Sequence, residues 1–394
     1  MPQLKSAFYT NEATFWHSAG QYILQFPVGG WIEPPAGSAH AESPESKRRL
    51  LNLFKRSGLM DSFAVNSAEP ITYQDAKLVH DTAYLDELKR VSDAGGGQLS
   101  APFRVDTPVG VKTYDIALMS AGLAYQAVKD VYQGVYQNAY SLSRPPGHHA
   151  TKNQAMGFCY LNNISIAIEK AKKELGLGRV AIVDWDVHHG NGQQDIFYDR
   201  DDVLTISIHQ ESCYPNESIV AKGDEKSAIE ACGVGKGEGY NLNIPLLPGS
   251  GEAIYLYALD NLVIPALEAY QPEMIIIASG FDANTLDPLA RMMLHSEAYY
   301  KMSKRMKRLA ESLCDGKLVI VHEGGYAESY VPFCGLASLE ALSGKKTEVE
   351  SPALDFFISQ QPKATFNQFH RDLIDKWCAY FKEKTILQEQ ISIV

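Results

Sequence analysis

The segment 180–192, VAIVDWDVHHGNG, places a short apolar run directly before a cluster of carboxylates and histidines. The run 180–183 is rich in β-branched residues and has no polar alternation, which is typical of a parallel strand buried on both faces. Asp184, Asp186 and His188 then follow at alternate positions, so an extended backbone would project their side chains to one side. Open parallel sheets bind ligands beyond the carboxyl ends of their strands. The segment therefore predicts a binding site at the end of a central strand.

Strands and helices alternate along most of the chain. The pattern predicts strands at 139–142, 180–183, 203–209, 240–244, 274–278 and 318–321. It predicts helices at 72–92, 114–133, 163–175, 252–270 and 296–314, one that starts near Ser43, and a terminal helix beyond residue 345. Residues 1–60 are otherwise irregular, and glycine and proline make 28–44 a loop. The alternation favours an α/β fold with parallel crossovers.

Composition indicates a globular protein with a full core. The chain has 394 residues, of which 45% are hydrophobic, and no run approaches the roughly 18 consecutive apolar residues that a membrane span needs. The first residues show no basic segment followed by an apolar run, so we expect no secretory signal and a cytoplasmic protein. The formal net charge of −11 disfavours a nucleic-acid partner.

The cysteines are scattered along the chain without a close pair. They are Cys159, Cys213, Cys232, Cys314, Cys334 and Cys378. This spacing argues against both a disulfide framework and a thiolate zinc site, so we expect reduced thiols.

Polar residues follow four separate predicted strands. They are His148 and His149, then Asp184, Asp186 and His188, then Asp282, and finally the segment 323–326, which ends in Tyr326. A parallel sheet can bring such strand ends together. Two carboxylates and one imidazole suit a divalent cation such as zinc and leave a position for water, which becomes a nucleophile when the metal binds it. A nearby imidazole can transfer protons and a tyrosine can donate to an oxyanion, so the set predicts metal-assisted amide hydrolysis.

Each of these residues also has a purely structural interpretation. A single aspartate at a strand end usually caps a helix or bonds a loop, and the Asp-x-Asp-x-His pattern alone leaves even odds. His148 and His149 after Pro-Pro-Gly could form a polar turn, and Tyr326 could be a core aromatic residue with a bonded hydroxyl. The coincidence of all four groups at successive strand ends favours the catalytic interpretation.

Several long motifs resemble the zinc-dependent histone deacetylase family. They are RPPGHHA, MGFCYLNN, VDWDVHHGNGQQDIF, VLTISIHQ, SGFDANTLDPLARM and EGGY. The similarity is strongest to the class II branch and the bacterial histone-deacetylase-like amidohydrolases, with acetylpolyamine amidohydrolases as relatives. It covers about residues 8–345 and implies one catalytic domain over 1–394, with a C-terminal extension at about 346–394. The implied fold is the arginase-deacetylase fold, three α/β/α layers around a mostly parallel sheet of about eight strands.

The resemblance also implies a role for each site residue. Asp186, His188 and Asp282 resemble the zinc ligands. His149 would be the general base and then acid, and Tyr326 would polarise the amide carbonyl. His148 would be an electrostatic partner oriented by Asp184. Asn191 stands where class I members have an aspartate, and this uncharged partner should raise the basicity of His149 less than a carboxylate would.

The family also binds potassium and admits its substrate through a narrow tunnel. The matching positions for a first potassium site are Asp184, Asp186, His188, Ser207 and Ile208, and those for a second are Phe197, Arg200, Val203 and Tyr240. The matching tunnel positions are Gly157, Phe158, Tyr214 and Gly325. The carbonyl of Gly157 would accept from the substrate amide. Tyr214 falls where phenylalanine is more usual, so a hydroxyl would line that wall, unless Tyr214 is an ordinary surface-loop residue.

Departures from the family motifs and alternative functions limit how specific the functional prediction can be. Ser46 stands where many class II members have arginine after Pro-Glu, which leaves recognition at the rim open. Arginase-like enzymes need further carboxylates where this chain has Gly190 and Asn284, so we reject ureohydrolase activity. A catalytically weak acyl-lysine binder on the same fold is the alternative function, and the retained histidines and Tyr326 argue against it. The expected substrate is an acetylated lysine peptide or acetylated small amine, and the bacterial relatives imply a homo-oligomer. Zinc and iron(II) are both compatible with the ligand set.

Overall fold

A parallel sheet forms the centre of the computed structural model, which describes residues 5–20, 22–24, 26–27, 39–215 and 227–386. Its strands are β1 (Ser6–Tyr9), β5 (Phe63–Asn66), β6 (Asn138–Ser141), β7 (Val180–Asp184), β8 (Val203–Gln210), β9 (Asn241–Leu246), β10 (Met274–Ser279) and β11 (Leu318–His322). These 8 strands are arranged in the order β5-β1-β6-β11-β10-β7-β8-β9, and every neighbouring pair is parallel. The predicted α/β class and parallel sheet are therefore confirmed.

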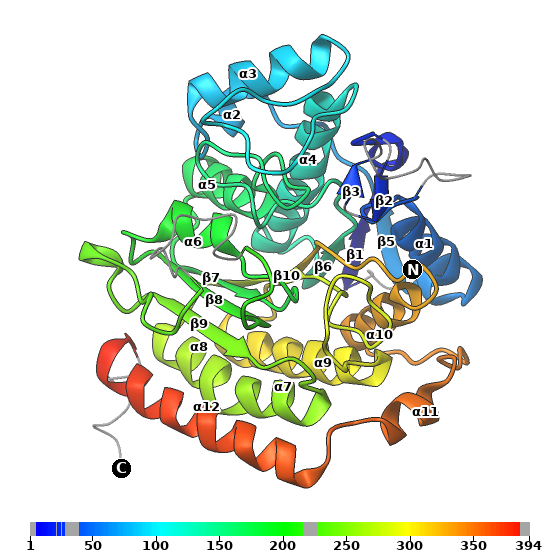
Figure 1. The fold of residues 1–394 in the computed structure, drawn as a ribbon, viewed down its shortest axis with the longest axis vertical. Coiled ribbons are helices and arrows are strands. Elements are labelled where there is room, and N and C mark those ends of the chain that lie inside the picture. Colours follow the sequence, from blue (N-terminus) through cyan, green and yellow to red (C-terminus); the bar gives the residue numbers. More distant parts are fainter. Residues whose placement is uncertain (1–4, 21, 25, 28–38, 216–226, 387–394) are drawn as a thin grey trace.

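Helices cover both faces of this sheet. The helices are α1 (Glu45–Arg56), α2 (Tyr73–Ala76), α3 (Thr82–Asp93), α4 (Thr113–Tyr132), α5 (Asn163–Leu175), α6 (Asn191–Phe197), α7 (Glu252–Ala258), α8 (Ile264–Tyr270), α9 (Ser296–Leu313), α10 (Val331–Ser343), α11 (Leu354–Ser359) and α12 (Ala364–Lys384). Figure 1 shows α4 and α5 on one side of the sheet and α7, α8 and α9 on the other, with α12 outside α7 and α8. None of the described helices is both long and apolar enough to cross a membrane.

The central strand β7 is buried on both faces, as its unbroken apolar run predicts. Val180 and Ile182 pack into the core that includes residues of α4 and α5. Ala181 and Val183 point the other way, into the core that includes residues of α7, α8 and α9. All four side chains are fully buried. Because each face of the strand buries apolar surface, the position of β7 at the centre of the sheet is stabilised from both sides.

The N-terminal part of the chain contains structure that its irregular sequence did not predict. β1 and β5 are only four residues long, too short for an alternation pattern to mark them. A second, 3-stranded sheet contains β2 (Tyr22–Leu24), β3 (Phe26–Pro27) and β4 (Ala39–His40). Of the predicted loop 28–44, residues 28–38 lie outside the described residues.

Two predicted helices are interrupted. The helix expected over 72–92 consists of α2 and α3, because Thr72 caps a first short helix and the chain restarts at Asp81. The helix expected over 252–270 contains a π-helical turn, Leu259–Val263, between α7 and α8. The helix at 163–175 begins and ends as predicted, with the Asn162 side chain capping its start and Gly176 in a left-handed conformation at its end.

Candidate active site

The site lies at the carboxyl ends of four adjacent strands. In the sheet order these strands are β6, β11, β10 and β7, and the segment after each one carries one of the polar groups found in the sequence. The register pairs Asp184 of β7 with Ala278 of β10, and Ser279 of β10 with His322 of β11. Parallel strands end at the same edge of the sheet, so groups up to about 180 residues apart meet there.

Asp186, His188 and Asp282 form a buried group of potential metal ligands. One donor atom from each residue lies within 4.8 Å of the other two. Nδ1 of His188 is 3.1 Å from Oδ1 of Asp186 and 3.2 Å from Oδ2 of Asp282. Both aspartates are fully buried and His188 is 7% exposed. The extended backbone that would project Asp184, Asp186 and His188 to one side does not continue past the strand, because β7 ends at Asp184 and the chain bends through 186–188.

Backbone amides hold the two carboxylates in place. Asp186 accepts from the amides of His188 (3.0 Å) and Gly324 (2.9 Å), while Oδ1 of Asp282 accepts from Val187 (2.8 Å). Gly324 must be glycine, because a Cβ there would lie 2.2 Å from Oδ2 of Asp282. That same Oδ2 accepts no hydrogen bond within the described structure.

The donor set of this group fits a divalent cation. Two buried carboxylates converge on one imidazole nitrogen, and a buried charge is costly unless it is paired or coordinates a metal. Burial and the neighbouring Asp186 charge raise the pKa of Asp282 to about 6. An ion among the three donors would bind the Asp282 oxygen that accepts no hydrogen bond and would offset the like charges of the two aspartates. Two oxygens and one nitrogen are a ligand set found in catalytic zinc sites.

His148 and His149 lie side by side, with ring centroids 3.9 Å apart, but they have different partners. Nδ1 of His148 is 3.0 Å from Oδ2 of Asp184, and Nδ1 of His149 is 2.7 Å from Oδ1 of Asn191. The Asn191 amide nitrogen donates to the carbonyl of His149 (3.3 Å), so its Oδ1 is the acceptor. His149 therefore carries its proton on Nδ1 and leaves Nε2 free.

The surroundings of the two histidines shift their pKa values in opposite directions. Burial alone would lower the pKa of His148, but the carboxylates of Asp186 and Asp184 raise it to about 10. Burial, together with the neighbouring His148 and His188, lowers the pKa of His149 well below its ordinary value. The site thus pairs a charged imidazole with a neutral one.

Tyr326 reaches the same site from the loop after β11. Its ring centroid is 6.4 Å from that of His188 and 5.8 Å from that of Phe158. Its backbone amide donates to Oδ2 of Asp287 (2.8 Å), a buried carboxylate that also accepts from the amide of Leu289 (3.0 Å). Sequence reasoning missed Asp287, although it lies within the SGFDANTLDP motif and precedes a proline, a common position for such a loop-bonding aspartate.

The predicted tunnel residues lie around these catalytic candidates. The Tyr214 ring packs edge-on against His149 at 4.8 Å and His188 at 6.0 Å between centroids. Gly157, at φ +55°, approaches His149 so closely that a Cβ would lie 2.2 Å from its ring. Phe158 follows at φ +66° and contacts Tyr326. Gly325, which directly precedes Tyr326, has a φ of +123° and packs against Phe281.

Asp106 ties the two walls of this region together and was not predicted. Its Oδ1 accepts from the amide of Gly157 (3.0 Å) and its Oδ2 from the hydroxyl of Tyr214 (2.8 Å). The adjacent Thr107 hydroxyl accepts from the amide of Phe158 (2.9 Å). No local motif marks Asp106, because its partners lie 51 and 108 residues away.

The residues matched to potassium sites fall into two groups. Asp184 pairs with Ser207 between β7 and β8, next to Ile208, so the first group adjoins the candidate metal ligands. In the second group, the amide of Arg200 donates to the carbonyl of Phe197, and Thr205, two residues after Val203, donates to the carbonyl of Tyr240. The guanidinium of Arg200 pairs with Asp202 and Glu169, so only its backbone carbonyl is suited to a cation.

Comparisons with known proteins identify relatives of this chain. The model of the histone deacetylase domain matches residues 40–342. A histone deacetylase-like amidohydrolase of Pseudomonas aeruginosa is 50% identical over 377 residues, which cover 96% of each chain. A probable deacetylase of Archaeoglobus fulgidus is 38% identical over 76% of this chain and 81% of its own. The crystal structure of the HDA15 HD domain superposes with a TM-score of 0.74 at 29% identity, covering 96% of this chain and 99% of that one.

Proposed function

Because this chain belongs to the histone deacetylase family, we propose that it is a zinc-dependent deacylase that hydrolyses the acyl amide of acetyl-lysine or of an acetylated aminoalkyl molecule. The observation that carries the proposal is the buried group of Asp186, His188 and Asp282, with an Asp282 oxygen that accepts no hydrogen bond. These three side chains would hold the zinc ion. When bound, zinc polarises the amide carbonyl and lowers the pKa of water so that it can attack.

His149 takes the proton from the attacking water in this proposal. Its Nδ1 donates to Asn191, so its free Nε2 is the base, and its lowered pKa keeps the ring neutral before reaction. The same nitrogen then gives the proton to the leaving amine. His148, held at Nδ1 by Asp184 and charged because of its raised pKa, supplies a fixed positive charge to the developing anion.

Tyr326 completes the site by donating its hydroxyl to the carbonyl oxygen as negative charge develops there. Asp287 fixes the backbone of Tyr326, and Phe158 packs against its ring. Tyr214 and Phe158 would form the walls of a tunnel that fits an unbranched aminoalkyl chain. The Gly157 carbonyl would accept the substrate N–H.

We also propose potassium as a structural cation, on the groups described above, and a cytoplasmic homo-oligomer acting on acetylated peptides or small amines. The first potassium group has the stronger support, because Ser207 and Asp184 lie next to each other in adjacent strands.

A substitution of Asp186 by alanine tests the central claim. Asp186→Ala should abolish both zinc binding, measured by metal analysis after dialysis, and turnover of an acetyl-lysine peptide and an acetylated polyamine assayed in parallel. Asp93→Ala is the matched control, because Asp93 is the last residue of α3 and its side chain is 47% exposed. Full activity of metal-free Asp186→Ala would falsify the proposal, and zinc binding without turnover of any acylated amine by the unmodified protein would favour the acyl-lysine binder. The ratio of the two substrate rates assigns the substrate class.

A further inference from the structure

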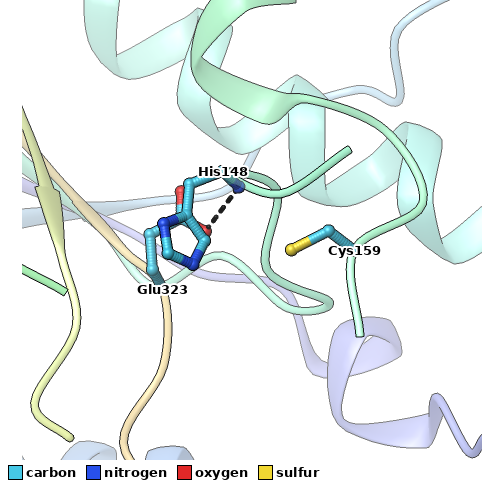
Figure 2. Close-up of side chains that lie close together, drawn as sticks. All are labelled: His148, Cys159 and Glu323. Carbon is cyan, nitrogen blue, oxygen red and sulfur yellow. Dashed lines mark hydrogen bonds between the residues drawn. The ribbon is translucent and has the colours of Figure 1, made fainter. Parts of the chain in front are cut away.

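A second buried group of potential metal ligands lies beside the candidate active site. It contains His148, Cys159 and Glu323, with one donor atom from each residue within 4.8 Å of the other two. Figure 2 shows that the three side chains converge from separate segments, with Cys159 directed toward the other two. The exposed fraction is 2% for His148 and 0% for Cys159 and Glu323.

Glu323 is the residue whose environment calls for a ligand. Its Oε2 accepts from the amides of Gly147 (2.6 Å) and His148 (3.2 Å), and the second of these bonds is drawn in Figure 2. Its Oε1 is buried and has no hydrogen-bond partner in the described structure. A carboxylate oxygen left unpaired in the interior costs free energy that a cation can recover.

Cys159 adds a donor that distinguishes this group from the first. Its thiol makes a weak contact with the carbonyl of Gly157 at 3.4 Å, and the side chain is not in a disulfide. Burial raises the pKa of the thiol well above its ordinary value, so without a metal it stays protonated and unreactive. Metal binding deprotonates a coordinating thiol. Because the protonated thiol does not react with an oxidant, the group is suited to a cation rather than to an oxidant.

We propose that His148, Cys159 and Glu323 form a second site, which binds a thiophilic divalent cation such as zinc. Nitrogen, sulfur and carboxylate oxygen are the three donor types that zinc accepts. One donor atom from each of the three residues lies within 4.8 Å of the other two, which is close enough for all three to bind one ion after small side-chain movements. His148 also contacts Asp184 at 3.0 Å, so a cation bound to its ring would engage a side chain that is part of the candidate active site.

Occupation of this site inhibits the enzyme. This consequence rests on the proposed function, because a cation bound to His148 occupies a side chain that the proposed mechanism uses. Zinc beyond the first equivalent should therefore lower activity, and the loss should be reversed by a chelator too weak to strip the first site.

Cobalt(II) added to the zinc-loaded protein provides the direct test. Asp186, His188 and Asp282 include no sulfur, so a thiolate-to-cobalt charge-transfer band in the near ultraviolet reports a cysteine ligand. We expect a band in the unmodified protein that disappears in Cys159→Ser and persists in Cys334→Ala, the control with an equally buried thiol in α10. The apparent Kd should rise more than about 100-fold in Cys159→Ser, since loss of even an outer partner of a metal ligand costs about 10- to 100-fold.

The Asp282→Asn protein separates this proposal from the proposed function. That change removes a ligand of the first site and leaves all three residues of the second, so the cobalt band should remain while deacylation is lost. If Cys159→Ser does not fold, Glu323→Gln in its place should weaken binding by at least about tenfold. Absence of the band from the unmodified protein, or a band that persists in Cys159→Ser, overturns the second site and leaves the first unaffected.

Discussion

Two buried clusters of charged side chains in this chain offset the free-energy cost of burying charge in different ways. Around Glu42, cations outnumber the carboxylate: Oε1 lies 2.9 Å from Nε of Arg144 and 3.5 Å from Nζ of Lys47. Around His188, carboxylates outnumber the imidazole, and an oxygen of Asp282 accepts no hydrogen bond. In the first cluster one carboxylate is paired with two cations, whereas in the second two carboxylates share one imidazole, and a bound cation would offset their charge.

The Glu42 cluster connects distant parts of the chain. The Arg144 guanidinium also donates to the carbonyls of Thr14 (2.9 Å), His17 (3.0 Å) and Glu42 (3.1 Å). Arg144 stands four residues before His148, so this cluster anchors the start of the loop that carries His148 and His149 to the N-terminal segment. Buried charge therefore stabilises the fold in the first cluster, and in the second it forms the group that we propose to bind a metal.

The largest expected effect is in Asp282→Asn. Loss of one of three ligands should abolish stoichiometric zinc binding and turnover. The metal-free variant should unfold at the same temperature as the metal-free unmodified protein or higher, because the change removes a like charge beside Asp186. Metal analysis and thermal unfolding after chelation measure both results. A clear fall in the stability of the metal-free variant would show that this cluster stabilises the fold on its own.

The opposite response is expected in Glu42→Gln. Removing the carboxylate leaves Arg144 and Lys47 buried without their counter-charge, which should lower the free energy of unfolding by about 3–5 kcal/mol. Urea unfolding with and without zinc measures this loss, which should be independent of the metal. The control is Glu45→Gln, an acid in the first turn of α1 with a side chain 43% exposed. Equal stability of the two variants would contradict the comparison.

Tyr326→Phe should separate chemistry from folding. Because the hydroxyl acts on the developing oxyanion, its loss should reduce kcat by about 10²- to 10³-fold. Zinc content and unfolding temperature should not change, since the ring and the backbone bond to Asp287 remain. Steady-state kinetics with metal analysis checks both parts. An unchanged kcat would remove Tyr326 from the proposed mechanism.

Acid should erase the contribution of Glu42. Although burial alone would raise it, Arg144 and the other neighbouring cations hold the pKa of Glu42 well below its usual range. Such a carboxyl stabilises the fold above its unfolded pKa, about 4.3, and loses that contribution as pH falls toward the folded value. The stability difference between unmodified protein and Glu42→Gln should therefore be full at about pH 7 and shrink below about pH 4. Urea unfolding over this range measures it, and a difference that grows in acid would reverse the assigned sign.

The sequence predicted which polar residues meet at one edge of the sheet better than it predicted the residues that support them. Long apolar strands such as β7 and β10 are recognisable from their sequences alone. The polar residues Asp186 and Asp282 come soon after these strands, so they could be identified as candidate site residues without a structure. The predicted reason was incomplete, because the chain bends after Asp184 and the backbone amides of Val187 and Gly324 aim the carboxylates.

The residues that support the site were not predictable from local pattern. Glu42 meets Arg144 across 102 residues, and Asp106 meets Tyr214 across 108. Neither pair lies on a periodic face or in a turn motif, so only the tertiary fold reveals it. The short strands β1 and β5 were not predicted for a related reason. A strand of four residues is stabilised by its neighbours in the sheet rather than by a pattern in its own sequence.

The last variant, with the smallest change, tests whether Glu42 contributes to the free energy of unfolding because it is buried rather than only because it is paired. Arg305 and Asp260 form an ion pair at 2.8 Å, as close as that of Arg144 and Glu42, but their side chains are 34% and 45% exposed. Water solvates either charge when its partner is removed, so Arg305→Ala should lower the free energy of unfolding by less than about 1 kcal/mol. Urea unfolding at low and high salt measures it, and salt should reduce the loss further. A loss as large as that of Glu42→Gln would mean that contact distance governs both pairs, and the contrast between a buried and a solvated carboxylate would no longer explain why the first cluster stabilises the fold.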